Sequence, residues 1–148
     1  MNEDSKNQVV GRTKWVFLLI GIFALIWNIM GCLNFFMQIS PDGLEKLPES
    51  HQAIVSVRPF WVTAVFGISV TTGVLGAVLL LMKKRFSIVV FFISFVAAVV
   101  TTLHAIVFAD ILKLFSPSEM VLGVVGPLVA GALFVGFSIV AHNKHWIE

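Results

Sequence analysis

Few side chains in this sequence have the chemistry for catalysis or metal binding. His104 and Asp110 stand six residues apart at the end of a long apolar run, and they form a candidate proton site at an outer mouth. The alternative is a pair of ordinary polar residues at the bilayer surface, where ionisable groups are tolerated. His142 and His145 share a helical spacing but lack a third ligand, which is typical of a solvated tail.

Other chemical motifs are missing. The sequence has no paired carboxylates, no glycine-rich phosphate loop and no Cys-His set. The aspartates and glutamates fall in polar segments or at the ends of apolar runs, whereas cation-coupled transport normally uses a carboxylate at membrane depth. We therefore expect no enzyme, no metal site and no cofactor.

Asn28 is the most informative polar residue because it interrupts an apolar run. It follows Trp15 by 13 residues, or about 20 Å along a helix. An amide at that depth must find hydrogen-bond partners inside the protein. We expect a structural bond to the second apolar run, with Ser69 as the nearest candidate; Thr71 or Thr101 are alternatives, as is contact with a ligand in a central cleft.

Four apolar runs must position these residues. They cover about 15–37, 60–82, 86–109 and 121–141, and each reaches the roughly 20 residues that span a ~30 Å hydrocarbon core as a helix. Hydrophobic residues make up 58% of the chain and charged residues 12%, about half the charged share of a soluble domain. The sequence predicts one all-α domain over residues 1–148, a bundle of four transmembrane helices.

The polar segment 38–59 separates the first two runs. Ser40-Pro41-Asp42-Gly43 is a turn signal, and Pro48 can open a short helix that covers about 50–57. Arg58 precedes Pro59 and is biased away from helix, so we expect a break before the second span.

The distribution of cations predicts the orientation. With both termini in the cytoplasm, seven basic residues lie inside and three lie outside, which satisfies the positive-inside rule. The inside set is Lys6, Arg12, Lys14, Lys83, Lys84, Arg85 and Lys144, and the outside set is Lys46, Arg58 and Lys113. No basic face forms, so the expected partner is the lipid bilayer and not nucleic acid.

Small residues recur at helical spacing in each run and predict where helices meet. In lipid, helices associate through close packing at small residues and through interhelical hydrogen bonds. We therefore expect the packing surface, or the lining of a polar cavity, to include Asn28, Gly31, Ser69, Gly73 and Thr101.

Cys32 is the single cysteine, so an intramolecular disulfide is excluded. Ile29-Met30-Gly31-Cys32 loosely matches the cleavage box of bacterial lipoproteins, in which the cysteine becomes lipidated. Met30 fits that box poorly and Asn28 interrupts the stretch before it. We favour the alternative, a small side chain packed within a membrane helix.

Several short motifs resemble one family. The chain resembles small bacterial four-helix inner-membrane proteins of unknown role, which often carry the label "sugar transporter". The motifs lie between about residues 15 and 110: Trp27-Asn28-Ile29-Met30-Gly31 with Gln38, Pro59-Phe60-Trp61, Gly73-Val74-Leu75-Gly76 and Phe92-Ile93-Ser94. The chain has no tyrosine, with Phe35 and Phe36 where the family tends to place one. The resemblance implies a multi-pass protein of the bacterial inner membrane.

Two functions fit these observations. One is a non-catalytic accessory or structural membrane subunit, which predicts a dry, fully packed bundle. The alternative is a small transporter or permeation protein for a small polar solute, which predicts a cavity lined by Trp27, Asn28, Ser69 and Thr101. Four short helices leave little room for a cleft in one copy, so transport would require a homo-oligomer or other membrane proteins. On this ground the sequence favours the accessory role.

Overall fold

The computed structural model describes the backbone of residues 3–148 and the side chains of residues 14–148. Its described residues form helices and connecting turns, without strands. The long helices are α1 (Glu3–Ile39), α4 (Phe60–Leu81), α5 (Phe86–Phe108) and α8 (Gly126–Asn143). Shorter segments connect them: α2 (Pro41–Leu44), α3 (Glu49–Ser56), α6 (Ile111–Leu114), α7 (Pro117–Met120) and the π-helical η1 (Val121–Val125).

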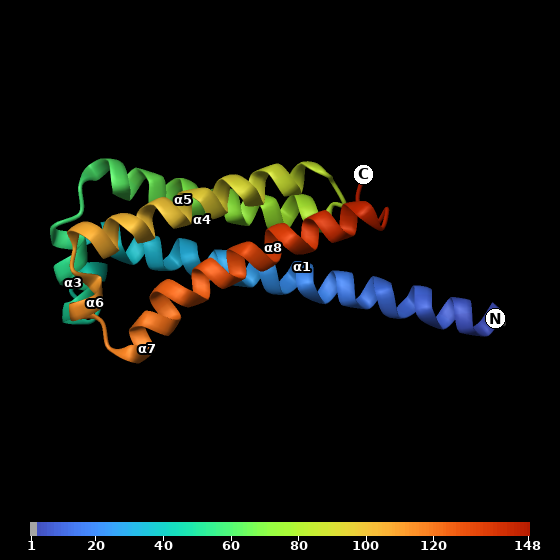
Figure 1. The fold of residues 1–148 in the computed structure, drawn as a ribbon, viewed down its shortest axis with the longest axis horizontal. Coiled ribbons are helices and arrows are strands. Elements are labelled where there is room, and N and C mark those ends of the chain that lie inside the picture. Colours follow the sequence, from blue (N-terminus) through green and yellow to red (C-terminus); the bar gives the residue numbers. More distant parts are fainter. Residues whose placement is uncertain (1–2) are drawn as a thin grey trace.

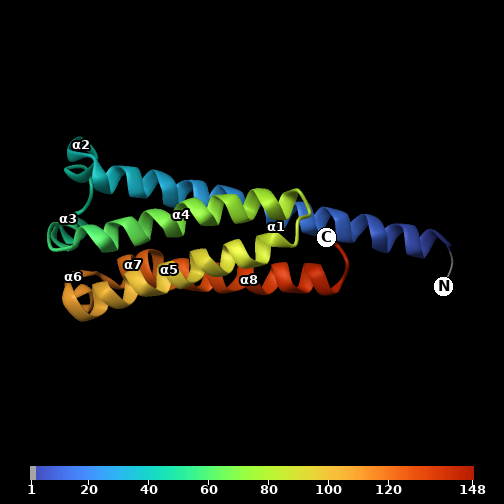
Figure 2. The same cartoon turned by 90° about the horizontal axis from the view of Figure 1, so that it is seen from above.

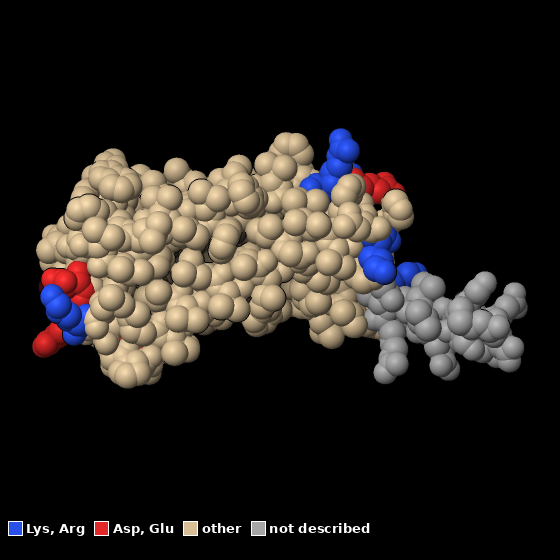
Figure 3. All heavy atoms as spheres, viewed as in Figure 1, with Lys and Arg blue, Asp and Glu red and all other residues tan. Residues whose placement is uncertain are grey.

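Four segments are long and apolar enough to cross a membrane, which confirms the predicted helical bundle. They are Lys14–Ile39, Phe60–Leu81, Phe86–Phe108 and Pro117–Asn143. On the face seen in Figure 3, the coloured charged side chains gather at the two ends and leave an uncharged band between them. The protein is therefore a multi-pass membrane protein. Lys6 and Arg12, counted in the predicted orientation, lie outside the residues whose side chains are described.

The four spans pack in the order α1, α4, α5, α8. Helix α4 packs against α5 and α1, and α5 packs against α8. Both chain ends lie at one end of the bundle, and α3 and α6 lie at the other (Figure 1). Figure 2 shows α1 and α4 on one side, with α5 and α8 on the other. We call the end with α3 and α6 the cap end, and the opposite end the terminal end.

The segment between α1 and α4 folds as predicted. The Ser40 hydroxyl accepts a hydrogen bond from the backbone N–H of Gly43 (3.0 Å) and so caps the single turn of α2. Pro48 then precedes α3, and Pro59 precedes α4. Because proline fixes its own φ and disfavours helix in the residue before it, each proline marks a helix start.

The fourth span begins at Pro117, four residues earlier than the predicted start near 121. Ser116 and Glu119 form a reciprocal capping box that starts α7. The helix then passes through the π-helical turn η1. Pro127 explains that turn, because a proline has no N–H for the carbonyl of residue 123 and its ring crowds that carbonyl. A wider turn accommodates both effects.

A buried apolar cluster closes the terminal end. Residues of all four spans contribute to it, together with the C-terminal segment: Phe17, Ala24, Ala77, Leu80, Phe91, Ala130, Phe134, Ala141 and Ile147. Ile147 is only 2% exposed. The backbone N–H of Glu148 donates to the Lys83 carbonyl (2.7 Å), and the N–H of Arg85 donates to the Glu148 carbonyl (2.5 Å). The C-terminal segment is thereby fixed to the basic turn between α4 and α5.

Three glycines in the spans pack directly against aromatic rings of neighbouring helices. A Cβ atom on Gly76 would lie 2.8 Å from the Phe91 ring, and a Cβ on Gly131 would lie 2.9 Å from the Phe95 ring. Gly67 faces the ring of Phe35 in the same way, at 3.0 Å. These three glycines, which lie outside the predicted packing surface, therefore form notches for aromatic rings of neighbouring helices.

Candidate functional site

The bundle contains a cavity of about 430 Å³, which we call the inner chamber. All four spans line it, through Trp27, Asn28, Ser69, Ser94, Phe95, Thr101, Pro127 and Phe134 among others. The expectation that one copy leaves little room for a cleft is therefore wrong. Phe91, Phe95 and Gly131 of the glycine notches line this space, as does Pro127 after the π-helical turn.

The inner chamber reaches the surface of the bundle between α1 and η1. Met30 and Leu122 both line it, and they are 62% and 73% exposed. We infer a lateral opening at these two side chains, which face the acyl chains in a membrane. A solute dissolved in the bilayer can enter there without crossing water.

Ser69 and Ser94 join α4 to α5 beside the inner chamber. The Ser69 hydroxyl donates to the Ser94 backbone carbonyl (2.9 Å), and the Ser94 hydroxyl donates to the Ser69 carbonyl (2.7 Å). Ser69 is buried and Ser94 is half-buried. Both hydroxyl donors are satisfied, so this pair holds two helices at a fixed distance and offers little further polarity to the chamber.

Asn28 faces α4, but its predicted bond to Ser69 is wrong. Its side-chain amide donates to the Ala24 carbonyl in its own helix (2.7 Å). A Cβ atom on Gly73 would overlap the Asn28 amide, so the amide fills the space that this glycine leaves. Ser69 is already engaged by Ser94, and a carbonyl one helical turn back is within easy reach of an asparagine. Among the described residues the Asn28 amide oxygen has no hydrogen-bond partner.

Two other predicted packing residues, Thr101 and Gly31, also line the inner chamber. Thr101 lines the inner chamber and donates to the Ala98 carbonyl of its own helix (2.9 Å). Gly31 lines the chamber and lies against Val70, whose side chain would be 3.3 Å from a Cβ on Gly31. Cys32 is a half-buried thiol within α1.

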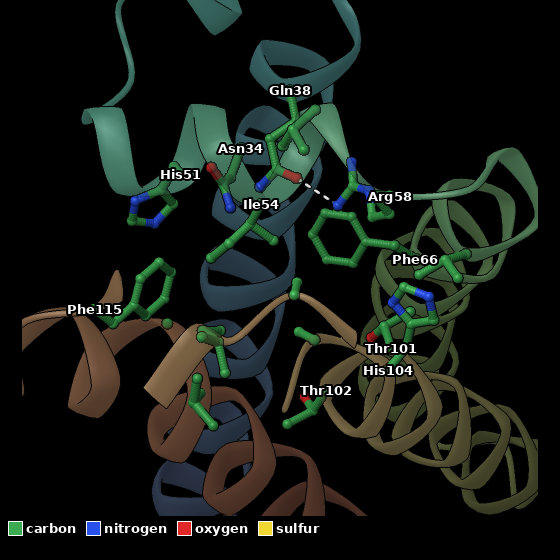
Figure 4. Close-up of a pocket in the computed structure, with 17 residues that line it drawn as sticks. Asn34, Gln38, His51, Ile54, Arg58, Phe66, Thr101, Thr102, His104 and Phe115 are labelled. Carbon is green, nitrogen blue, oxygen red and sulfur yellow. Dashed lines mark hydrogen bonds between the residues drawn. The ribbon is translucent and has the colours of Figure 1, made fainter. Parts of the chain in front are cut away.

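A second, smaller cavity of about 130 Å³ lies at the cap end, and we call it the outer chamber. Figure 4 shows its side chains, which come from α1, α3, α4, α5 and the connecting segments. It shares Asn34, Phe66, Thr101, Thr102 and Gly123 with the inner chamber. The two chambers are therefore neighbours with common walls, a more polar compartment toward the cap end and a more apolar one at mid-bundle.

Arg58 is the cation of the outer chamber. Its Nη1 donates to the Gln38 side-chain oxygen (2.8 Å; Figure 4), and its Nε donates to the Thr63 hydroxyl (3.2 Å). The guanidinium also lies over the Phe66 ring, 5.6 Å from its centroid. The remaining nitrogen, Nη2, is buried and has no hydrogen-bond partner among the described residues. Burial lowers the pKa of Arg58 from its ordinary value.

Helix α3 forms one wall of the outer chamber. Ile54 of α3 packs with Ala109, Ile111 and Val124 in a buried cluster. Glu119 of α7 accepts a hydrogen bond from the Ser50 hydroxyl (2.5 Å), and the His51 ring stacks on Phe115 at 4.6 Å. These contacts fix α3 to the start of the fourth span, and we call them the α3–α7 latch.

The latch contains a titratable group outside the spans. His51 Nδ1 lies 3.6 Å from a Glu119 carboxylate oxygen. Burial lowers the pKa of His51, and the charge of Glu119 opposes this effect without cancelling it. The closed latch therefore favours the neutral imidazole.

His104 and Asp110 do not form the predicted site at the outer mouth. His104 lines the outer chamber and contacts the rings of Trp61 and Phe108, with centroids 5.5 and 5.1 Å away. Asp110 is exposed, adopts a left-handed conformation that aspartate tolerates, and pairs with Lys113 (3.1 Å). The aromatic environment holds His104 inward, whereas the turn after α5 directs Asp110 to solvent.

Arg58, Ser94 and Glu119 are the functional candidates that sequence reasoning missed. The sequence predicts for Arg58 an external charge and a break before Pro59, but no site role. Ser94 stood in a family motif without a role, although a serine in an apolar run is itself a signal for an interhelical bond. Ser116 and Glu119 have the spacing of a capping box, which marks the start of the fourth span.

Comparisons with known proteins gave no match. The chain matches no protein-family model, no curated protein and no solved structure. The resemblance to small four-helix inner-membrane proteins therefore stays a prediction, and the function must be argued from the cavity alone.

Proposed function

We propose that this protein binds a small, mainly apolar molecule inside its bundle, as a carrier or permeation protein of the membrane does. The observation that supports this proposal is the inner chamber of about 430 Å³ within a single copy. Pockets for small molecules typically measure roughly 300–1,000 Å³ and combine apolar walls with a few polar groups. The inner chamber has both properties.

The same observation favours binding over the accessory role. A purely structural subunit predicts a dry, packed bundle, but Trp27, Asn28, Ser69 and Thr101 line one open space. The rings of Phe95 and Phe134 supply much of its other surface. A sugar would leave its hydroxyls facing these rings without partners, which is costly. We therefore propose an apolar or amphipathic solute in place of the sugar that the family label suggests.

Transport would require one further movement. The cluster around Phe17, Leu80 and Phe134 closes the terminal end, with Ile147 packed beneath it. A solute in the inner chamber therefore communicates with the bilayer and the outer chamber, but not with the terminal end. In our proposal the side chains of this cluster must separate when the solute moves from the inner chamber to the terminal end. The proposal includes no catalytic step and no cofactor.

We further propose that the protein resides in the cytoplasmic membrane of a bacterium with both termini inside. The support is the excess of cations at the terminal end, where Lys14, the turn from Lys83 to Arg85 and Lys144 lie. Reporter fusions after Glu148 and within residues 38–59 test the orientation. A periplasmic signal from the fusion after Glu148 would contradict it.

Binding can be measured by quenching of tryptophan fluorescence. A variant that keeps only Trp27 among the four tryptophans is placed in nanodiscs of zwitterionic lipid. Dodecanol brominated at its terminal carbon is the probe, because bromine quenches indole fluorescence on contact. We expect a saturable component above the linear quenching that arises from bilayer partitioning.

Two matched substitutions locate the probe. Ala98→Leu narrows the inner chamber that Ala98 lines and should remove the saturable component. Ala132→Leu makes the same change on the exposed face of α8 and should leave that component intact. Purely linear quenching in the parent protein, or equal quenching in both variants, would refute the proposed function.

A further inference from the structure

We infer that the two chambers together hold a single-chain amphiphile with an anionic head group, the head at Arg58 and the alkyl chain in the inner chamber. This inference rests on the proposed function and specifies its ligand class. It depends on three features: a half-buried cation with one buried nitrogen that has no partner, an outer chamber without acidic lining residues, and a neighbouring apolar compartment of suitable size.

Arg58 has hydrogen-bonding capacity that the protein leaves unused. Its Nε and Nη1 donate to two neutral oxygens, of Thr63 and Gln38, and its Nη2 is buried without a partner. The ion pairs among the described residues are His51–Glu119 and Lys113–Asp110, and neither involves Arg58. A buried charge normally has an ionic partner, since an uncompensated one is destabilising. An anionic head group supplies the partner, and a guanidinium binds carboxylate or phosphate oxygens well.

The rest of the outer chamber suits an anion. Among its described lining residues none is acidic, and Asn34, Thr102 and His104 carry groups that can donate hydrogen bonds. Two acidic residues close to this lining in the chain or fold are already engaged: Glu119 by Ser50 and by the capping box at Ser116, and Asp110 by Lys113. No described carboxylate therefore competes with a ligand for the guanidinium.

The inner chamber suits an alkyl chain. An engineered apolar cavity of about 150 Å³ holds a benzene ring, so a chamber of about 430 Å³ holds on the order of 15 carbon atoms by the same scale. Phe66 and Thr101 line both chambers, and in this inference the chain passes these two residues on its way from Arg58 into the apolar part. The lateral opening at Met30 and Leu122 admits such a chain from the bilayer.

The test compares two probes that differ only in the head group. Dodecanoate and dodecanol, each brominated at the terminal carbon, are titrated against the Trp27-only protein at a pH where the carboxylate is ionised. We expect the carboxylate to bind about tenfold more tightly than the alcohol, the ratio typical of one charge-assisted hydrogen bond. Arg58→Gln should remove this difference, and Arg58→Lys should restore part of it.

Two further arms make the outcome decisive. Ala98→Leu should lower the binding affinity for dodecanoate more than that for octanoate brominated in the same way. It should preserve the preference for carboxylate over alcohol. That result would show that head and chain occupy different chambers. Nanodiscs that contain lysophosphatidylglycerol, a single-chain lipid with an anionic head group, show the source of the head group: competition with dodecanoate identifies a membrane lipid, and no competition identifies a free amphiphile.

The outcomes separate this inference from the proposed function. Saturable quenching by both probes with equal affinity, unchanged by Arg58→Gln, would refute the anionic head group while leaving the cavity's binding function intact. Absence of saturable quenching by either probe would refute both. If Arg58→Gln does not fold, the carboxylate-to-alcohol ratio in Arg58→Lys and in the parent protein decides the question.

Discussion

The hydroxyls of Ser69 and Ser94 donate hydrogen bonds to each other's backbone carbonyl oxygens, at 2.9 and 2.7 Å. This reciprocal pair joins α4 to α5 in the apolar middle of the bundle. Neither water nor lipid can replace such bonds there. The pair therefore sets the spacing of the two helices that form one wall of the inner chamber.

Removal of this pair should loosen the α4–α5 contact. We expect Ser69→Ala and Ser94→Ala each to lower the free energy of unfolding by about 0.6 kcal/mol and by no more than ~1.7 kcal/mol. Denaturation of the bilayer-reconstituted protein measures the change. Thr71→Ala is the control, because Thr71 is exposed and bonds only within its own helix. An effect of Thr71→Ala as large as that of the serines would contradict the prediction.

The contact between Gly73 and Asn28 should be intolerant of one added methyl group. In Gly73→Ala the Asn28 amide must change rotamer and lose its bond to Ala24, which should cost about 1–3 kcal/mol of unfolding free energy. Asn28→Ala in the same chain should recover most of that loss. Gly136→Ala is the matched control, since a Cβ there meets nothing within 4 Å. Additive effects of the two substitutions would show that the residues do not touch.

The sequence predicts the spans well because that information is local. An apolar run in lipid must satisfy its backbone internally, and a helix does so without reference to any neighbour. The partner of Asn28 was not predictable in this way, because a carbonyl of its own helix competes with every distant hydroxyl. The inner chamber depends on how the rings of Phe95 and Phe134 pack against other helices, and no pattern within one span reports that geometry.

The α3–α7 latch should control access to the outer chamber. Glu119→Ala removes the acceptor of the Ser50 hydroxyl and of Ser116, so α3 should open more often. We expect a several-fold rise in the amide hydrogen exchange of α3, with α4 and α5 unchanged. Glu45→Ala is the control, because Glu45 is an exposed carboxylate residue of the polar segment 38–59 that contains α3. Unchanged exchange in Glu119→Ala would show that the buried cluster around Ile54 alone holds the cap.

Acidification should also loosen the latch. Because burial lowers the pKa of His51 in the folded protein, the stability that the neutral ring contributes is present above its ordinary pKa of 6.5 and is lost as the pH falls through the lowered value. Spin labels on α3 and α7 should therefore report a broader distance distribution as the pH falls below 6.5. His51→Phe retains a ring against Phe115 without a titratable group, and its distribution should not change with pH. A tighter latch at low pH would instead mean that the attraction of Glu119 outweighs burial.

A crystal structure of the protein under xenon pressure shows directly whether the inner chamber is an open apolar space. Xenon enters apolar cavities that are large enough and does not bind a packed core. We predict a xenon peak inside the inner chamber, beside Trp27 and Phe95, that disappears in Ala98→Leu and persists in Ala132→Leu. A structure without that peak, in which the rings of Phe95 and Phe134 fill the space between the helices, would refute the proposal that the inner chamber binds small molecules.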